Sequence, residues 1–170
     1  MTILALDLST KASGWAIFED GNLKDYGCIT AGSANLYKRI DKMVEGIKEI
    51  LEKYKINKVV LEDVIPDDVK HNVQVYKALT YLQGYILHTL DDYKLLPAEF
   101  FTASQWRKRC GIHTGRGVKR ESLKPKDIQF VKDTYNIEVN DDIADAICIG
   151  HAYISPPAAA QYETSGFEFK

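Results

Sequence analysis

Residues 3–18 of the chain read ILALDLSTKASGWAIF, which is two apolar runs of strand length joined by the polar turn STKAS. The next segment, NLKDYGCITAG, continues as a third strand after an Asp-Gly turn. We therefore predict an antiparallel β-meander in this part of the chain. The first run carries one carboxylate, Asp7, near its end. Taken alone, an Asp at a strand end has the simple explanation of a turn residue.

The following segment changes from the period of a strand to that of a helix. Apolar residues recur every three or four positions from Leu36 to Tyr54, which is typical of a helix with one buried face. The run KVVLE, residues 58–62, then predicts a short strand that ends in Glu62. A helix and a strand after a meander indicate an α/β fold in which the chain crosses back over the sheet.

A second long helix is predicted for residues 68–91, where apolar side chains cover an unusually wide face. Val75, Ala78, Tyr81 and Tyr85 extend that face beyond a simple amphipathic stripe. Two explanations remain open. The helix is buried between layers of the same chain, or it also packs against a second subunit.

The C-terminal part alternates basic and apolar segments. The stretch AEFFTASQWRKRCGI predicts a short strand, a Thr or Ser cap, and a basic helix that stops at Gly111. Residues 113–125 are rich in glycine and basic side chains, and we expect a mobile loop there. Helices are predicted for residues 126–136 and from a cap at Asn140 or Asp141 to Tyr153.

Composition indicates one globular domain. The chain has 170 residues, of which 45% are hydrophobic and 27% charged, enough to form a core. We expect the domain to cover residues 1–155 and residues 156–170 to form a flexible C-terminal tail. No apolar run approaches the ~20 residues of a membrane span, so we expect a cytoplasmic protein. The three cysteines are widely spaced and odd in number, which argues against a disulfide framework or a zinc site.

The charge of the chain is unevenly distributed. Between Arg107 and Lys126 there are eight Lys or Arg residues and one acid, a net charge of +7. Because the whole chain carries -2, the remainder carries -9. Such a basic segment favours an anionic partner, although a solvated charged face explains many runs of this kind.

Four carboxylates occupy comparable positions along the chain. Asp7 and Glu62 each end a predicted strand, whereas Asp142 and Asp145 open the last predicted helix. The spacing of the last two places them ~60° apart on one helix face. If the first and fourth strands are neighbours, all four carboxylates meet at one edge of the sheet. Each has a simpler explanation on its own, such as an N-cap for Asp142.

Carboxylates that are buried together repel one another unless a cation neutralises them. A hard divalent ion such as Mg²⁺ prefers oxygen ligands, and two such ions suit phosphoryl transfer. His151 lies about 180° round the helix from Asp142 and is expected to be structural rather than a ligand. The sequence therefore predicts a divalent-metal site formed by Asp7, Glu62, Asp142 and Asp145.

Taken together, these segments resemble the RuvC family of Holliday junction resolvases, and most closely its phage-type members. The similarity is carried by LALDLSTKASGWAIF, VVLEDV and VNDDIADAICIGHAY, in this order, with WRKRCGI and KRESLK between the last two. It covers about residues 1–155. The resemblance implies an RNase H-like α/β fold, a five-stranded mixed sheet flanked by helices. It also implies that the family's catalytic, metal-binding acids correspond to Asp7, Glu62, Asp142 and Asp145.

The resemblance also implies an activity. Members of this family are homodimers that hold a four-way DNA junction and nick two strands of like polarity, with two Mg²⁺ or Mn²⁺ ions in each active site. The helix 68–91 would then form the dimer surface. The DNA phosphates would be contacted by basic residues, namely Lys11, Arg116, Lys119, Arg120 and Lys124. Ile65 stands where cellular members often carry an aromatic residue, so a broader activity on branched DNA remains open.

Two other functions fit parts of the sequence. The stretch DLSTKASGWAIF also resembles the first phosphate loop of actin-like nucleotide-binding ATPases, but those proteins need a second glycine-rich phosphate motif and two such domains, and no such motif recurs here. A non-catalytic, nucleic-acid-binding RNase H-like protein would be indicated by the loss of an acid. All four acids are present.

Overall fold

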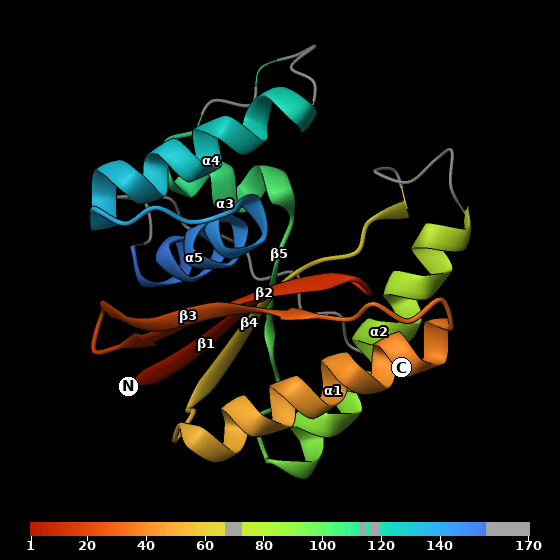
Figure 1. Cartoon of the computed structure of the whole chain (residues 1–170). Helices are drawn as coiled ribbons and strands as arrows, with labels where there is room; N and C mark the ends of the chain where they lie inside the picture. Colours follow the sequence, from red (N-terminus) through yellow and green to blue (C-terminus); the bar gives the residue numbers. More distant parts are fainter. Residues whose placement is uncertain (67–72, 113–114, 116–119, 156–170) are drawn as a thin grey trace, which may run out of the picture.

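The computed structural model describes residues 1–66, 73–112, 115 and 120–155 of the chain. The described strands are β1 (Thr2–Asp7), β2 (Ala12–Glu19), β3 (Asn22–Thr30), β4 (Lys58–Glu62) and β5 (Glu99–Phe101). The described helices are α1 (Leu36–Lys53), α2 (Val73–Asp92), α3 (Ala103–Arg109), α4 (Arg120–Tyr135) and α5 (Asp141–Ile154). The strands form a five-stranded sheet in the order β3-β2-β1-β4-β5. Helices α3, α4 and α5 cover one face of the sheet, and α1 and α2 cover the other (Figure 1).

The register of the central strands sets the geometry of the site. Strand β1 pairs antiparallel with β2, with Asp7 opposite Gly14. On its other side β1 runs parallel to β4, with Leu6 opposite Leu61. The first and fourth strands are therefore neighbours, which is the condition under which the four acids can meet at one edge. The sheet is mixed, as the family resemblance implies.

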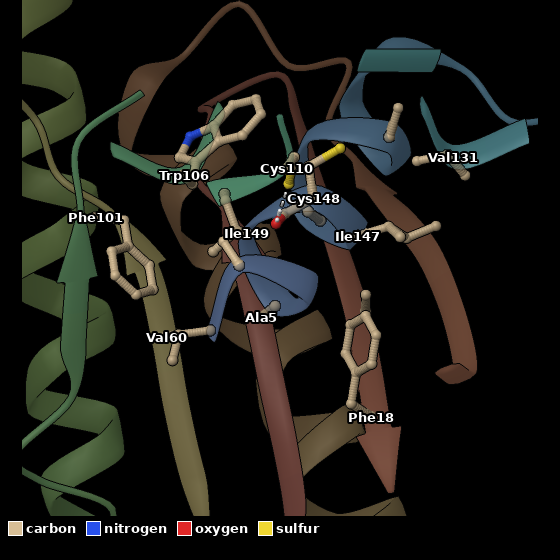
Figure 2. Close-up of a cluster of buried hydrophobic side chains, with 14 of the residues drawn as sticks. Ala5, Phe18, Val60, Phe101, Trp106, Cys110, Val131, Ile147, Cys148 and Ile149 are labelled. Atoms are coloured by element: carbon tan, nitrogen blue, oxygen red, sulfur yellow. Dashed lines mark hydrogen bonds between the residues drawn. The ribbon is translucent and has the colours of Figure 1, made fainter. Parts of the chain in front are cut away.

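Side chains alternate between two hydrophobic clusters, one on each face of the sheet. On the α5 side, Ile3, Ala5 and Val60 pack with residues of α3, α4 and α5. Leu4 and Leu6 point the other way and pack against α1 and α2. Figure 2 shows the first cluster, with Trp106 and Phe18 at opposite ends. Cys148 is fully buried in it, as expected for a small core residue.

Local signals in the sequence place most element boundaries correctly. The periodic apolar residues from Ile40 to Leu51 form the buried face of α1. Thr102 caps α3 through a capping box with Gln105, and Gly111 follows this helix with φ +72°, a backbone conformation that glycine adopts without strain. Asn140 caps α5, whose first residue is Asp141.

Helix α4 departs from the prediction. It begins at Arg120, inside the segment predicted as a loop, and Pro125 lies within it. The proline removes a single backbone donor near the start of the helix, so the helix persists through it. Most of the predicted loop, at residues 113–114 and 116–119, lies outside the described residues, as does the predicted tail 156–170.

Helix α2 is not buried between layers of one chain. Its described part begins at Val73, and residues 68–72 of the predicted helix lie outside the described residues. Of its wide apolar face, Tyr81 is 52% exposed and Tyr85 55%. Leu82 and Ile86, about 100° round the helix from these tyrosines, are fully buried in the core. Within the described residues, no helix combines the length and apolarity that a membrane crossing requires.

Candidate active site

The strand-borne acids lie on the same side of the sheet and at the same edge. Asp7 is the last residue of β1 and Glu62 the last residue of the parallel neighbour β4. Because side chains alternate along a strand, Asp7 shares the face of Ile3 and Ala5, and Glu62 shares the face of Val60. Both carboxylates therefore point towards the α5 side. Both are partly buried.

The two helix-borne acids reach this edge because α5 starts beside it. The Asn140 side chain accepts a hydrogen bond of 3.0 Å from the backbone N–H of Ile143 and so fixes the start of the helix. Asp142 then lies in the first turn. A Cβ atom on Gly14, the strand partner of Asp7, would lie 1.8 Å from the carbonyl oxygen of Asp142. The absence of a side chain at Gly14 is therefore what lets the helix begin next to β1 and β2.

Asp145 is buried and strongly perturbed. It is 7% exposed, and among the described residues its Oδ1 is a buried oxygen without a hydrogen-bond partner. Burial, followed by the negative charge of Asp7, raises the pKa of Asp145 to about 9. The charges of Asp127 and Glu62 act in the same direction, whereas the guanidinium of Arg107 opposes them. Asp7, Glu62 and Asp145 therefore share one electrostatic environment.

Asp142 belongs to the same acidic region. Burial, followed by the charge of Asp141, raises the pKa of Asp142. The thiol of Cys28 lies near the same acids. Its pKa is raised by burial and then by the charges of Asp142 and Asp7. Cys28 pairs with Gly14 on β2, so Asp7, Gly14 and Cys28 form a row across three strands.

Helix α3 supplies two neighbours of the acids that the sequence prediction missed. The indole Nε1 of Trp106 donates a hydrogen bond of 2.7 Å to Oε2 of Glu62. The next residue, Arg107, is buried, and Asp127 of α4 accepts hydrogen bonds from its Nε and Nη2 atoms. Arg107 Nη2 also lies 4.0 Å from Asp145 Oδ1. The only sequence signal was the clustering of WRKR, whose positive charge suggested a solvated or DNA-facing surface rather than a buried ion pair.

The donor set fits a divalent cation. As they stand, no three or more His, Cys, Asp or Glu side chains in the described parts of the chain are arranged to hold a metal ion. Even so, the buried Asp145 oxygen lacks a hydrogen-bond partner, and burial together with neighbouring carboxylates disfavours its charged form. A cation among these oxygens would relieve both penalties. Carboxylate oxygens are the ligands that Mg²⁺ and Mn²⁺ prefer.

The predicted DNA contacts are only partly described. Lys11 is exposed in the turn between β1 and β2. Lys124 is 43% exposed and forms an ion pair with Asp141, which raises the pKa of the lysine. Arg116 and Lys119 lie outside the described residues, as does the side chain of Arg120 at the start of α4. His151 contacts Tyr135 and Phe130, which is consistent with a structural role.

Comparisons with known proteins agree with this fold. The model of the Lactococcus phage M3 protein family matches residues 1–155. The crossover junction endodeoxyribonucleases RuvC of Citrifermentans bemidjiense and of Geobacter sp. strain M21 are each 28% identical over 163 residues. These alignments cover 89% of this chain and 93% of each relative.

Solved structures show the same architecture. The structure of T. thermophilus RuvC in complex with a Holliday junction substrate superposes with a TM-score of 0.69 at 12% identity, covering 88% of this chain and 89% of that chain. A second Thermus thermophilus RuvC structure gives a TM-score of 0.65 at 14% identity, covering 88% and 90%. The predicted RNase H-like fold is confirmed. The chain therefore belongs to the Lactococcus phage M3 protein family and is a homologue of the RuvC Holliday junction resolvases.

Proposed function

We propose that the chain is a structure-selective DNA endonuclease that resolves Holliday junctions and also cleaves other branched DNA. The observation that carries this proposal is the convergence of acids from β1, β4 and α5 on one sheet edge, with Asp145 buried and its pKa raised to about 9. Carboxylates with strongly perturbed pKa values cluster at functional sites, where a bound cation offsets their mutual repulsion. The kinship with RuvC supports phosphodiester hydrolysis as that chemistry.

The proposed metal ligands are the four predicted acids, Asp7, Glu62, Asp142 and Asp145. They would hold two Mg²⁺ ions, with Mn²⁺ able to substitute. Bound there, the ions would activate a water for in-line attack and stabilise the leaving 3′ oxygen. The chain itself must first release the proton of Asp145, since the ionised carboxylate is the ligand. Metal affinity should therefore rise with pH.

The remaining residues of the site would hold and orient the bound DNA. Lys11 extends from the turn that follows Asp7, and Lys124 lies beside the start of α5, so either ammonium group could meet a phosphate of the bound DNA. Arg116, Lys119 and Arg120 are proposed phosphate contacts from the basic segment. Ile65 offers no aromatic ring for stacking, which favours a broad range of branched substrates.

We further propose that the protein acts as a homodimer through α2. Two valines and two tyrosines of this helix are exposed, and a groove of about 510 Å³ is lined by residues of both α1 and α2. A second copy would cover this apolar surface. Replacing Tyr81 and Tyr85 together by Glu should convert a dimer to a monomer in sedimentation experiments. Lys55→Glu, an exposed change with the same charge difference just beyond the C-terminal end of α1, should leave the mass unchanged.

The nuclease proposal is tested with labelled four-way junction, flap and linear duplex DNA, each incubated with Mg²⁺ or with EDTA. We expect cleavage of the branched substrates in Mg²⁺ alone. An Asp7→Asn variant should still bind the junction and should not cut it. If the unmodified protein binds DNA and cleaves none of the substrates in Mg²⁺ or Mn²⁺, the chain is a non-catalytic nucleic-acid-binding protein instead.

A further inference from the structure

Trp106, in the hydrophobic core, donates a hydrogen bond to an acid of the candidate site. The residue is fully buried, and its ring belongs to the hydrophobic cluster under α5 (Figure 2). Its Nε1–H nevertheless donates a hydrogen bond of 2.7 Å to Oε2 of Glu62, which is not part of that cluster. A buried indole N–H needs an acceptor, and here the acceptor is one of the four candidate metal ligands rather than a nearby backbone carbonyl.

The indole is held in place from two directions. The guanidinium carbon of Arg107 lies over its ring, 4.1 Å from the centroid. Arg107 is in turn fixed by its ion pair with the fully buried Asp127, with an N–O distance of 2.8 Å. The capping box of Thr102 and Gln105 fixes the start of the short helix that carries both residues. The N–H is therefore oriented before any ligand arrives.

The chemistry of this donor suits a metal ligand. An indole N–H donates a single hydrogen bond and carries no charge. It can fix the orientation of a carboxylate without neutralising it, whereas a Lys or Arg in the same place would compete with a cation. Because Glu62 is bonded through Oε2, the orientation of its other oxygen is defined as well.

We propose that Trp106 is a positioning residue that orients Glu62 for divalent-metal binding. This inference rests on the proposed function, since it takes Glu62 as a metal ligand. Loss of a hydrogen-bonding neighbour of a metal ligand typically lowers metal affinity or activity by about 10- to 100-fold. We expect a loss of this size in Mg²⁺ affinity when the N–H is removed and the fold is kept.

The substitution that isolates the N–H replaces Trp106 by benzothienylalanine, which keeps the bicyclic shape and has sulfur in place of the nitrogen. Trp106→Phe is the genetically simple companion. Phe18→Leu serves as the matched control, because Phe18 is equally buried in the same cluster but lies at its opposite end (Figure 2). All three variants are first compared in urea unfolding, so that any loss of stability is known.

The primary measurement is the NMR signal of the indole N–H, which needs neither DNA nor cleavage. The chain has two tryptophans, Trp15 and Trp106, so two such signals are expected, and the Trp106 signal is identified by its loss in Trp106→Phe. Titration with Mg²⁺ should shift the Trp106 signal in the unmodified protein. In a Glu62→Gln variant, the same titration should leave it in place.

Metal affinity is then measured by calorimetry in the same variants. The benzothienylalanine protein should bind Mg²⁺ about 10- to 100-fold more weakly, and Phe18→Leu should bind it as the unmodified protein does. Combining Trp106→Phe with Glu62→Gln should cost no more than Glu62→Gln alone. Unchanged affinity in the benzothienylalanine protein would overturn the proposal, and so would an equal loss in Phe18→Leu. If the unmodified protein binds Mg²⁺ but cuts no DNA, the nuclease proposal fails while these measurements still decide the role of Trp106.

Discussion

Substituting Gly14 by Ala should move the acids at the start of α5, Asp142 and Asp145, away from the strand acids Asp7 and Glu62. The added Cβ would lie 1.8 Å from the carbonyl oxygen of Asp142, whereas an ordinary contact begins near 3.4 Å. The start of α5 must therefore move by about 1.6 Å, the difference between these distances. The obstacle is helix backbone, so no change of rotamer can relieve it.

This displacement should affect activity far more than folding. Overpacking of a core typically costs about 1–3 kcal/mol, which we expect as the loss in the free energy of unfolding. A misplacement of catalytic groups by about 1 Å can lower the rate by about 100-fold, so junction cleavage should fall by at least that factor. The two quantities are measured by urea unfolding and by single-turnover cleavage in saturating Mg²⁺.

Gly46→Ala is the matched control for this prediction. A Cβ there would meet side-chain atoms of Ile29 at 2.8–2.9 Å, on the face of the sheet away from the acids. The Ile29 side chain can shift, so this variant should lose some stability and keep its cleavage rate. A folded Gly14→Ala protein that cleaves as fast as the Gly46→Ala protein would refute the view that α5 must approach β2 this closely.

Three further predictions concern charges. Asp127→Asn removes the negative charge that pairs with the buried guanidinium of Arg107, and it should lower the free energy of unfolding by about 3–5 kcal/mol. The double change Arg107→Met, Asp127→Leu should cost less in the same denaturation assay, and a larger loss in the double variant would contradict this. Because the pKa of Asp145 is raised from 3.8 to about 9, the metal-free folded chain holds a proton that the unfolded chain releases. This contribution to stability is fully present below pH ~4 and is lost as the pH rises towards ~9. In unfolding experiments in EDTA, Asp145→Asn should therefore reduce the fall of the unfolding free energy across this pH range. An unchanged pH dependence would argue against the raised pKa of Asp145. Finally, Lys119→Ala combined with Arg120→Ala should weaken junction binding more at low salt than at high salt, and an equal loss at both would exclude phosphate neutralisation by these residues.

Most of the architecture could be predicted from local patterns in the sequence. The short apolar run ILAL before Asp7 and the three- and four-residue spacing from Ile40 to Leu51 each follow from the geometry of a single element, and the structure confirms the predicted strand and helix. The start of α4 was predicted wrongly because glycine and Pro125 suggested a loop, although one proline near a helix start removes only one hydrogen bond.

The contacts that shape the site could not be predicted in the same way. The bond between Trp106 and Glu62 joins residues 44 positions apart, and the pair of Arg107 and Asp127 joins residues 20 apart. Nothing in the sequence near Trp106 or Arg107 indicates which distant residue each will contact. A basic run such as WRKR usually faces solvent. Gly14 is a further example, because its role depends on a helix that begins more than a hundred residues later. Such features arise from tertiary packing, which periodicity does not encode.

The division of the core into two clusters has a consequence for how the protein can vary. The sheet separates the cluster around Trp106 from the cluster around Leu82, so substitutions in one have few shared neighbours with substitutions in the other. Free-energy changes at sites without common partners usually add to within about 0.5 kcal/mol. The surface of α2 can thus accumulate changes, for example to suit a different partner, without disturbing the layer that orients the acids. We therefore expect substitutions on the two faces of the sheet to affect stability independently.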